Sequence, residues 1–316
     1  MALIAGTAHR KSLLNPWRRE AVLGYLFAAP WILGFLGLTL GPMLFSLYAS
    51  FTRYNVVSDP IWAGLNNYSF IVSQDDRFRT ALVNQLYYVT VKTPVVIVGA
   101  LLLALLMNQD IPGQRLFRTI LYTPTIISGV ALVFLWIWVL NPEGLLNRGL
   151  GTVGIRGPNW FYDPAWTKNG MVVMQLWAVG GNVLLLVAGL KAIPKHLYEA
   201  AEIDGAGSLG KFFHVTIPML SPTLFFILVT SIIFGFQAFD QAYVISTIVG
   251  GQGGGVGQPG DPRQSLLFYE VYLYLRAFRD LQMGYASALA WILFVIIMAF
   301  TAIQLWAGRK WVYYES

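Results

Sequence analysis

Side chains that commonly perform catalysis or hold metals are scarce in this chain of 316 residues. The chain has no cysteine, which excludes disulfides, thiolate metal sites and cysteine nucleophiles. Its histidines are His9, His196 and His214, and no two of them are spaced as paired metal ligands on one helical face. These residue types predict neither a metal site nor the convergent acid–base cluster of an enzyme.

The densest group of charged side chains is the stretch EAAEIDGAGSLGK at positions 199–211. Charged residues make up only 11% of the chain, yet Glu199, Glu202 and Asp204 fall close together here. Carboxylates in such a position can pair with arginine or cap a helix. The chemistry that we expect of this stretch is therefore recognition of another surface.

The residues around this stretch predict two short helices joined by a tight turn. Lys195–Ile203 is rich in good helix formers, and Pro194 suits the first turn of a helix. Gly205 tolerates positive φ and should end this helix, and Ser208 is expected to cap the next one. A rigid element of this kind suits docking into a groove of a partner. The alternative is an ordinary solvated loop.

Two glycine-rich stretches superficially resemble nucleotide-binding loops. GAGSLGKF, at 205–212, has Phe212 where a phosphate-binding loop needs Ser or Thr to hold Mg²⁺. GVGQPG, at 255–260, has no preceding strand, and Pro259 disfavours a helix start. We therefore expect that any nucleotide used by this protein is bound by another chain.

The composition indicates the environment in which these elements lie. Hydrophobic residues make up 56% of the chain, and the mean hydropathy is +0.59. Soluble domains typically carry about 25% charged residues, more than twice the share found here. A lipid bilayer is the solvent that fits, and the net charge of +6 is then explained by basic cytoplasmic ends, with no nucleic acid as partner.

Runs of about 20 apolar residues predict an all-α integral membrane protein with six transmembrane helices. The expected spans are 21–50, 82–107, 116–140, 170–190, 222–243 and 284–306. Pro30 and Pro42 predict kinks in the first span. Residues 249–262 are predicted to be a mobile low-complexity loop, and 264–278 to lie along the outer membrane interface.

Lysine and arginine predict the orientation of these spans. The basic residues of one set of loops lie in short segments close to span ends, where the positive-inside rule applies best. This places both termini and the 191–220 loop in the cytoplasm.

The acidic stretch resembles the EAA signature of membrane subunits of binding-protein-dependent ABC importers. That pattern is Glu-Ala-Ala, three residues, Gly, nine residues, Ile, one residue and Leu-Pro. The chain has Glu199-Ala200-Ala201, Gly205, Val215 and Ile217-Pro218. The two departures, Val for Ile and Ile for Leu, keep the apolar character of their positions.

Further segments resemble carbohydrate-type permeases of this family, namely 117–150, 234–247 and 283–297. The resemblance covers about residues 80–308 and includes a typical first span, although the 249–262 loop is longer than usual. It implies a type I ABC importer permease fold in a bacterial inner membrane. The implied organisation is a cytoplasmic tail (1–20), a first transmembrane helix (21–50), a transmembrane domain (80–308) with a cytoplasmic coupling loop (194–222), and a second cytoplasmic tail (309–316).

The resemblance also implies function and partners. The coupling loop would fit a cleft on a cytoplasmic ATPase subunit, through Glu199, Ala200, Ala201, Asp204 and Gly205. The implied partners are a second related permease, two ATP-binding subunits, an extracytoplasmic solute-binding protein and membrane lipid. This chain would need no cofactor of its own, because ATP and Mg²⁺ would bind to the ATPases. The implied role is part of a translocation pathway for a sugar or oligosaccharide.

Polar residues inside the spans are candidates for that pathway, since amides and carboxylates pair with sugar hydroxyls and aromatic rings stack on sugar faces. The candidates are Gln175, Asn182, Gln237, Phe239, Asp240 and Tyr243, with Trp177 as a further aromatic. Gln175 and Asn182 are seven residues apart and should project from nearly one face. Lys92 lies near the middle of the second span and is either a functional residue or paired within the bundle.

Three alternatives stay open on the sequence. A permease of the same class could carry a non-sugar solute. A stand-alone secondary transporter would usually show inverted repeats and ion-coupling carboxylates deep in its spans, and apart from Asp240 the sequence shows no such acid. An integral membrane enzyme would need a convergent catalytic constellation that the sequence does not offer.

Overall fold

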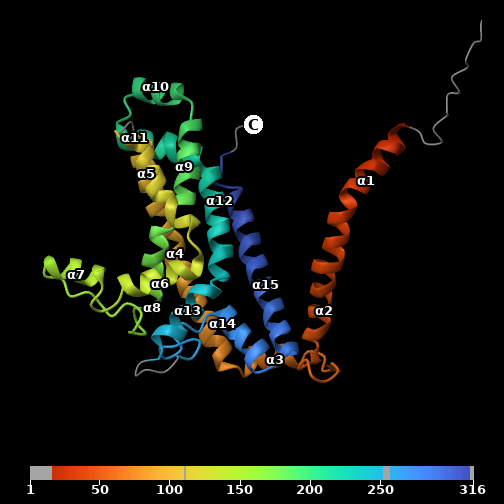
Figure 1. Ribbon diagram of the computed structural model, residues 1–316. Helices are drawn as coiled ribbons and strands as arrows, with labels where there is room; N and C mark the ends of the chain where they lie inside the picture. Colours follow the sequence, from red (N-terminus) through yellow and green to blue (C-terminus); the bar gives the residue numbers. More distant parts are fainter. Residues whose placement is uncertain (1–15, 110–111, 252–256, 314–316) are drawn as a thin grey trace, which may run out of the picture.

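A computed structural model describes residues 16–109, 112–251 and 257–313 of the chain, and these residues are mostly helical (Figure 1). The α-helices are α1 (Pro16–Gly34), α2 (Gly41–Ser50), α3 (Asn66–Ser73), α4 (Asp76–Met107), α5 (Gln114–Tyr122), α6 (Gly129–Val139), α7 (Leu145–Thr152), α8 (Thr167–Trp177), α9 (Gly180–Ala192), α10 (Lys195–Ile203), α11 (Ser208–Lys211), α12 (Ile217–Phe236), α13 (Phe239–Val249), α14 (Tyr269–Tyr274) and α15 (Met283–Gly308). Three short segments are π-helical, namely η1 (Phe35–Leu40), η3 (Phe212–Thr216) and η4 (Leu275–Arg279), and η2 (Thr123–Ile126) is a 3₁₀ turn. The strand β1 (Thr52–Arg53) pairs antiparallel with β2 (Ile61–Trp62). The all-α prediction is confirmed.

Four of these helical stretches are long and apolar enough to cross a membrane: Glu20–Ser50, Asp76–Met107, Ser208–Phe236 and Met283–Gly308. Two bent pairs raise the number to six if each pair is one span. Those pairs are α5–η2 with α6, bent by 107°, and α8 with α9, bent by 49°. The six predicted spans therefore correspond to four continuous and two broken ones.

The breaks fall where helical hydrogen bonding is interrupted. Pro124 lies in η2, a short 3₁₀ turn, because proline donates no backbone hydrogen bond to an α-helix. Gly180 begins α9, and a Cβ atom there would lie 2.0 Å from the carbonyl oxygen of Leu121. Only glycine permits this close approach of α9 to the end of α5.

The core surrounds α4, which contacts α8, α9, α12 and α14. Along one half of α4, Tyr88 and Val89 pack with Phe236, Phe268 and Tyr269. Along the other half, small residues such as Ala100 and Ala104 pack with the apolar faces of α9 and α12. Small residues allow close helix packing in membranes, where lipid supplies no hydrophobic drive for association. α4 is thus the central element of the bundle.

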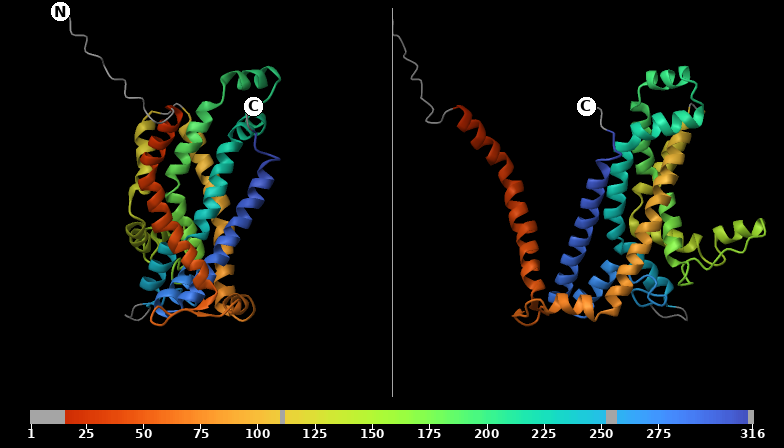
Figure 2. Two further views of the ribbon diagram at one scale, coloured as in Figure 1. Left: turned by 90° about the vertical axis from the view of Figure 1, so that its right-hand side faces the viewer. Right: turned by 180° about the vertical axis from the view of Figure 1, so that it is seen from behind.

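The two ends of the bundle differ in structure. α10 and α11 project from one end, which we call the α10 end, and the β-hairpin, α3 and α14 lie at the other, the hairpin end (Figures 1 and 2). The start of α1 and the end of α15 both lie toward the α10 end (Figure 2). The described chain therefore begins and ends at the same face as the acidic stretch.

A carboxylate ties three helices together at the hairpin end. Asp75 caps α4 by accepting hydrogen bonds from the backbone N–H groups of Arg77 (3.0 Å) and Phe78 (3.1 Å). The Tyr272 and Tyr285 hydroxyls also donate to Asp75, which joins α4 to α14 and α15. Burial alone would raise the pKa of Asp75, but these hydrogen bonds lower it overall.

The first span stands apart from the remaining helices. α1 diverges from the bundle, and only its continuation α2 packs on α15 near the hairpin end (Figure 2). The most apolar window of Glu20–Ser50 has no buried residue, and Phe27 is 82% exposed. At the junction, a Cβ atom on Gly284 would lie 2.1 Å from the Thr52 carbonyl oxygen, so glycine is required there.

Some expectations are refined by the structure, and others fall outside the described ranges. The 264–278 segment packs into the core through Phe268, Tyr269 and Tyr272, and its place at the outer membrane interface stays a prediction. Gly207, and not Ser208, is the N-cap of α11. The predicted mobile loop at 249–262 includes residues 252–256, and the two predicted tails include residues 1–15 and 314–316, all outside the described residues.

Candidate functional site

The acidic stretch forms a helix that ends in a glycine-dependent turn. α10 covers Lys195–Ile203, as the sequence predicts, and Gly205 has φ +80°. The N–H of Gly205 donates to the Glu202 carbonyl (3.0 Å), and the N–H of Ala206 donates to the Ala201 carbonyl (2.8 Å). This pair of bonds, with glycine in the left-handed conformation, is a Schellman motif. The predicted break at Gly205 is therefore observed.

Contacts on both sides of the turn hold α10 against the bundle. Leu197 and Tyr198 pack on the core half formed by α4, α9 and α12, and the Tyr198 hydroxyl hydrogen-bonds the Thr216 hydroxyl (3.0 Å). The Lys211 ammonium pairs with the Glu202 carboxylate at 2.7 Å. This hydrogen bond, and the positive charge of Lys211, lower the pKa of Glu202. Exposed ion pairs of this kind contribute little to stability because water screens them, so the apolar contacts dominate.

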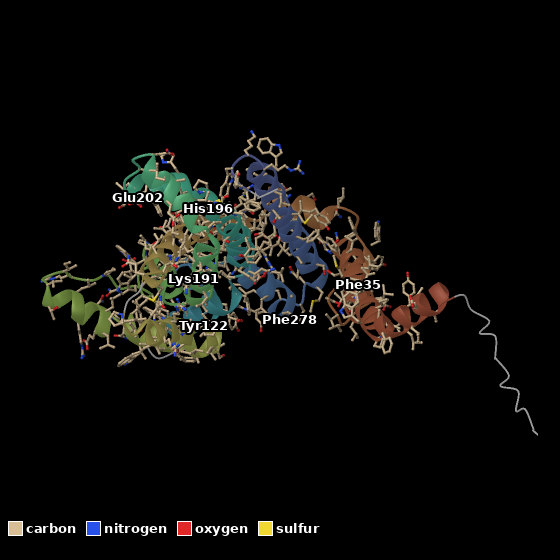
Figure 3. The ribbon with its side chains drawn as sticks, turned by 90° about the horizontal axis from the view of Figure 1, so that it is seen from above. Phe35, Tyr122, Lys191, His196, Glu202 and Phe278 are labelled. Atoms are coloured by element: carbon tan, nitrogen blue, oxygen red, sulfur yellow. The ribbon has the colours of Figure 1, made fainter. Side chains whose placement is uncertain are left out.

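The outward surface of α10 and its turn is fully available to a partner. Glu199, Ala200, Asp204 and Gly205 are exposed, and Ala201 is half-buried. Figure 3 shows Glu202 and His196 on the helical arm that projects from the bundle. All five sequence-predicted residues of this loop thus belong to one compact element.

Two apolar side chains extend this surface beyond the predicted residues. Ile203 is 87% exposed and Leu209 is 74% exposed, one on each side of the turn. Large apolar side chains with so much exposure at a projecting turn are typical of docking surfaces. Sequence analysis did not identify Ile203 or Leu209 as part of this surface, since the exposure of an apolar residue is decided by the tertiary arrangement.

A second candidate site is a cavity of about 230 Å³ within the bundle. Its walls come from α4, α8, the end of α12 and the start of α13. The lining residues are Tyr88, Lys92, Gln175, Phe234, Gln237, Ala238, Phe239, Asp240 and Gln241. The fold thus brings four sequence-predicted pathway residues together: Gln175, Gln237, Phe239 and Asp240.

The cavity lies where the fifth span is interrupted. α12 ends at Phe236, not near position 243 as expected, and α13 begins at Phe239 after the linking residues Gln237 and Ala238. Non-helical backbone at membrane depth is tolerated where it lines a cavity, because its polar groups need partners other than lipid. The break therefore places the linking residues Gln237 and Ala238 in the cavity wall.

Amide side chains form a hydrogen-bonded group in the cavity. The Gln175 Nε2 donates to the Gln241 Oε1 at 2.9 Å, and the Tyr88 hydroxyl donates to the same oxygen at 3.5 Å. These groups carry donors and acceptors but no net charge, which suits hydroxyl-rich solutes. Sequence reasoning did not select Tyr88 or Gln241, because only the fold brings residues of α4, α8 and α13 together around this cavity.

Aromatic rings and a second acid flank the cavity. Phe239 stacks on Tyr243 with ring centroids 5.2 Å apart, and both contact Tyr274. Tyr243 does not line the cavity itself and instead supports Phe239. Burial, together with the negative charge of Asp240, raises the pKa of Glu270 to about 7.

Asn182 and Trp177 lie outside the cavity lining. The 49° bend between α8 and α9 interrupts the helical face that would have aligned Asn182 with Gln175. Trp177 instead packs edge-on against Trp136, with centroids 5.8 Å apart. Within residues 16–109, 112–251 and 257–313, no group of three or more His, Asp or Glu side chains is placed to hold a metal ion.

Comparisons with known proteins place the chain among transport proteins. The family model described as "Binding-protein-dependent transport system inner membrane component" matches residues 96–313. The chain is 37% identical to the probable ABC transporter permease protein YesP of Bacillus subtilis (strain 168), over 95% of this chain and 94% of YesP. It is 33% identical to the arabinooligosaccharides transport system permease protein AraP of Halalkalibacterium halodurans, over 94% of this chain and 92% of AraP.

A solved structure shares the fold. It is a chain of a bacterial alginate ABC transporter in complex with an alginate pentasaccharide-bound periplasmic protein. The TM-score is 0.77 with 21% sequence identity, covering 93% of this chain and 97% of that one. The predicted helical permease architecture is confirmed by this likeness.

Proposed function

The chain belongs to the family of binding-protein-dependent transport system inner membrane components, and on that premise we propose that it carries a sugar or oligosaccharide and receives work from ATPase subunits through the turn after α10. It is a permease subunit of an ABC importer that spans the membrane, and it is not an enzyme. The proposed solute class rests on the relatives named for carbohydrate transport.

One structural observation carries the proposed coupling role. Ser208–Phe236 is a continuous helical stretch of 29 residues that begins beside the exposed α10 turn and ends at the cavity. Its long final part, α12 (Ile217–Phe236), has 20 residues and at 1.5 Å per residue is about 30 Å long, the thickness of the hydrocarbon core of a bilayer. A displacement of the α10 turn would therefore reach Gln237 and Phe239 through a rigid element.

The α10 turn has the features of a docking element for an ATPase. Its exposed residues combine the carboxylates Glu199 and Asp204 with the apolar side chains of Ile203 and Leu209. Carboxylates pair bidentately with arginine, and apolar anchors exclude water from a protein interface. Two ATP-binding subunits would hold ATP and Mg²⁺, since the sequence offers no nucleotide site in this chain. The α10 end, with both chain ends, would then face the cytoplasm.

A second, related permease would complete the translocation pathway. The α1 part of the first span exposes apolar side chains away from the bundle, and a membrane helix with this free surface is suited to packing against another subunit. The cavity is smaller than the roughly 300–1,000 Å³ of complete small-molecule sites, as expected if a partner supplies another wall. An extracytoplasmic solute-binding protein would deliver the sugar at the hairpin end.

Reconstitution tests this function directly. The chain would be assembled in proteoliposomes with its second permease, ATPases and binding protein, and uptake of radiolabelled oligosaccharides measured with ATP inside. We expect uptake with ATP and none with a non-hydrolysable analogue. Uptake driven by a proton or sodium gradient without ATPase subunits would instead identify a secondary transporter.

A further inference from the structure

Lys92 is a buried basic residue that forms no ion pair with any of the described residues. It lies near the middle of α4, and the residue is 8% exposed. Its Nζ reaches one oxygen, the backbone carbonyl of Ser231 at 3.4 Å, and lies 5.9 Å from the centre of the Tyr88 ring. Among the described residues, no carboxylate lies within 4 Å of this ammonium.

This situation is energetically unfavourable unless something else supplies the negative charge. A charged residue near the centre of a membrane helix costs about 2.5–3.5 kcal/mol on insertion scales. One long hydrogen bond to a carbonyl that already serves a helix offsets little of that cost. Lys168, in contrast to Lys92, has two polar partners. It is half-buried near the hairpin end, and its ammonium donates to the Asn84 side chain at 3.1 Å and to the Ser265 carbonyl at 3.5 Å.

Lys92 opens onto the same cavity as the amide group. Gln175, Gln237 and Gln241 line that space together with Lys92 and supply donors and acceptors for hydroxyl groups. Asp240 also lines the cavity, but it forms no ion pair with Lys92. Among the described residues, the Lys92 ammonium therefore lies beside neutral amide groups, and the one acid of the cavity lining, Asp240, is more than 4 Å from it.

We propose that Lys92 binds the anionic group of an acidic sugar, so that the solute carried by this permease includes a carboxylate-, phosphate- or sulfonate-bearing saccharide unit. This inference rests on the proposed function, because it takes the cavity to be part of the solute pathway. The anionic group supplies the missing counterion, and the amides accept and donate hydrogen bonds to the hydroxyls. A charge-assisted bond in a site away from water discriminates strongly against a neutral analogue.

Ligand-dependent thermal stability of the assembled importer in nanodiscs tests the role of Lys92. The probes are galactose, galacturonic acid and galactose 6-phosphate, and the glucose series with glucuronic acid and glucose 6-phosphate. In the wild type, we expect at least one acidic sugar to bind about tenfold or more tightly than its neutral parent, the effect typical of a hydrogen bond to a charged group. The comparison of carboxylate with phosphate probes identifies which anion is preferred.

Variants of Lys92 distinguish binding of an anion by Lys92 from a purely structural role of this residue. Lys92→Met should reduce the acidic-to-neutral affinity ratio to about one without lowering the unliganded midpoint, since replacing a buried unpaired charge by an apolar side chain is neutral or stabilising. Lys92→Arg should retain the preference, and so should the matched control Lys168→Met. Loss of stability or assembly in Lys92→Met without ligand would show instead that a partner subunit supplies the counterion.

Two outcomes distinguish this inference from the proposed function. Equal affinity of the wild type for acidic and neutral sugars, with ATP-driven uptake of a neutral sugar intact in Lys92→Met, overturns the acidic-sugar inference alone. Absence of ATP-driven uptake for every sugar tested overturns the proposed function and the inference with it.

Discussion

Gly205 shows how one residue connects sequence to the proposed coupling role. Its φ of +80° places it in the left-handed region, where a Cβ atom costs about 1–2 kcal/mol. The motif with Glu199-Ala200-Ala201 could be recognised in the sequence because local turn chemistry determines it. Ile203 and Leu209 could not be added to it, since only the packed structure shows which apolar side chains stay uncovered.

Replacing Gly205 by valine should uncouple the importer. The branched side chain disfavours the conformation that the Schellman turn requires, so the exposed loop would change shape while the transmembrane bundle stays folded. We expect a large loss of ATP-driven uptake, and normal association with the solute-binding protein, in proteoliposomes.

Two matched variants control for this effect. Gly205→Asn should retain much of the activity, because asparagine visits the left-handed region. Gly207→Ala should retain uptake, since Gly207 has φ −70° and open space around its Cβ position, and the change only weakens the N-cap of the short helix α11. Full ATP-driven uptake in Gly205→Val would contradict the proposed coupling role of the turn.

The raised pKa of Glu270 predicts that the stability of the folded chain depends on pH. Its pKa is about 7 in the folded chain, against an ordinary value of 4.5, because burial and the charge of Asp240 disfavour its ionised form. The folded state therefore holds a proton that the unfolded state releases, and stability should fall between about pH 4.5 and 7 and then level off. Thermal unfolding across this range measures the slope.

Substitutions of Glu270 and Asp240 test whether Glu270 causes this pH dependence of stability. Glu270→Gln should flatten the slope, because the amide does not titrate. Asp240→Asn should narrow the pH range of the slope, because it removes the neighbouring negative charge. A slope unchanged in Glu270→Gln would assign the pH dependence to other groups.

At the scale of elements, the number and place of the apolar spans could be predicted but their breaks could not. Hydropathy sums over about 20 residues and is insensitive to a local turn. The 107° bend after η2 and the 49° bend before α9 depend on contacts between distant segments, such as that of Gly180 with Leu121. For the same reason, the sequence did not predict that Tyr88 and Gln241 line the cavity.

The contact between α5 and α9 gives a sharp test at this scale. Gly180→Ala would place a methyl group 2.0 Å from the Leu121 carbonyl oxygen, and the backbones would have to separate. Overpacking of this kind typically costs about 1–3 kcal/mol. We expect a lower unfolding midpoint of the assembled importer, and changed solute affinity because α9 continues into the cavity wall α8.

The adjacent glycine provides the control. Gly181 has no heavy atom within 4 Å of its Cβ position, so Gly181→Ala should leave the midpoint unchanged. Equal midpoints for the two variants would show that α5 and α9 are not in close contact in the membrane.

At the scale of the whole molecule, three features fit the proposed assembly with partner subunits. The α1 part of the first span diverges from the bundle, the cavity of about 230 Å³ is small, and the turn after α10 projects from the bundle with exposed outer residues (Figure 1). Composition predicted the membrane, and the motif predicted the partners. Neither predicted that a single helical stretch, Ser208–Phe236, connects the projecting turn to the cavity.

Site-specific cross-linking from the α10 turn tests the central claim most directly. The chain has no cysteine, so Ala200→Cys introduces a unique thiol at an exposed position, and Ser58→Cys provides a control at the hairpin end. In native membrane vesicles, we predict that Ala200→Cys forms a cross-link to an ATP-hydrolysing subunit and that Ser58→Cys does not. Cross-linking of Ala200→Cys to no ATPase, or of Ser58→Cys to an ATPase, would contradict the proposed coupling and orientation.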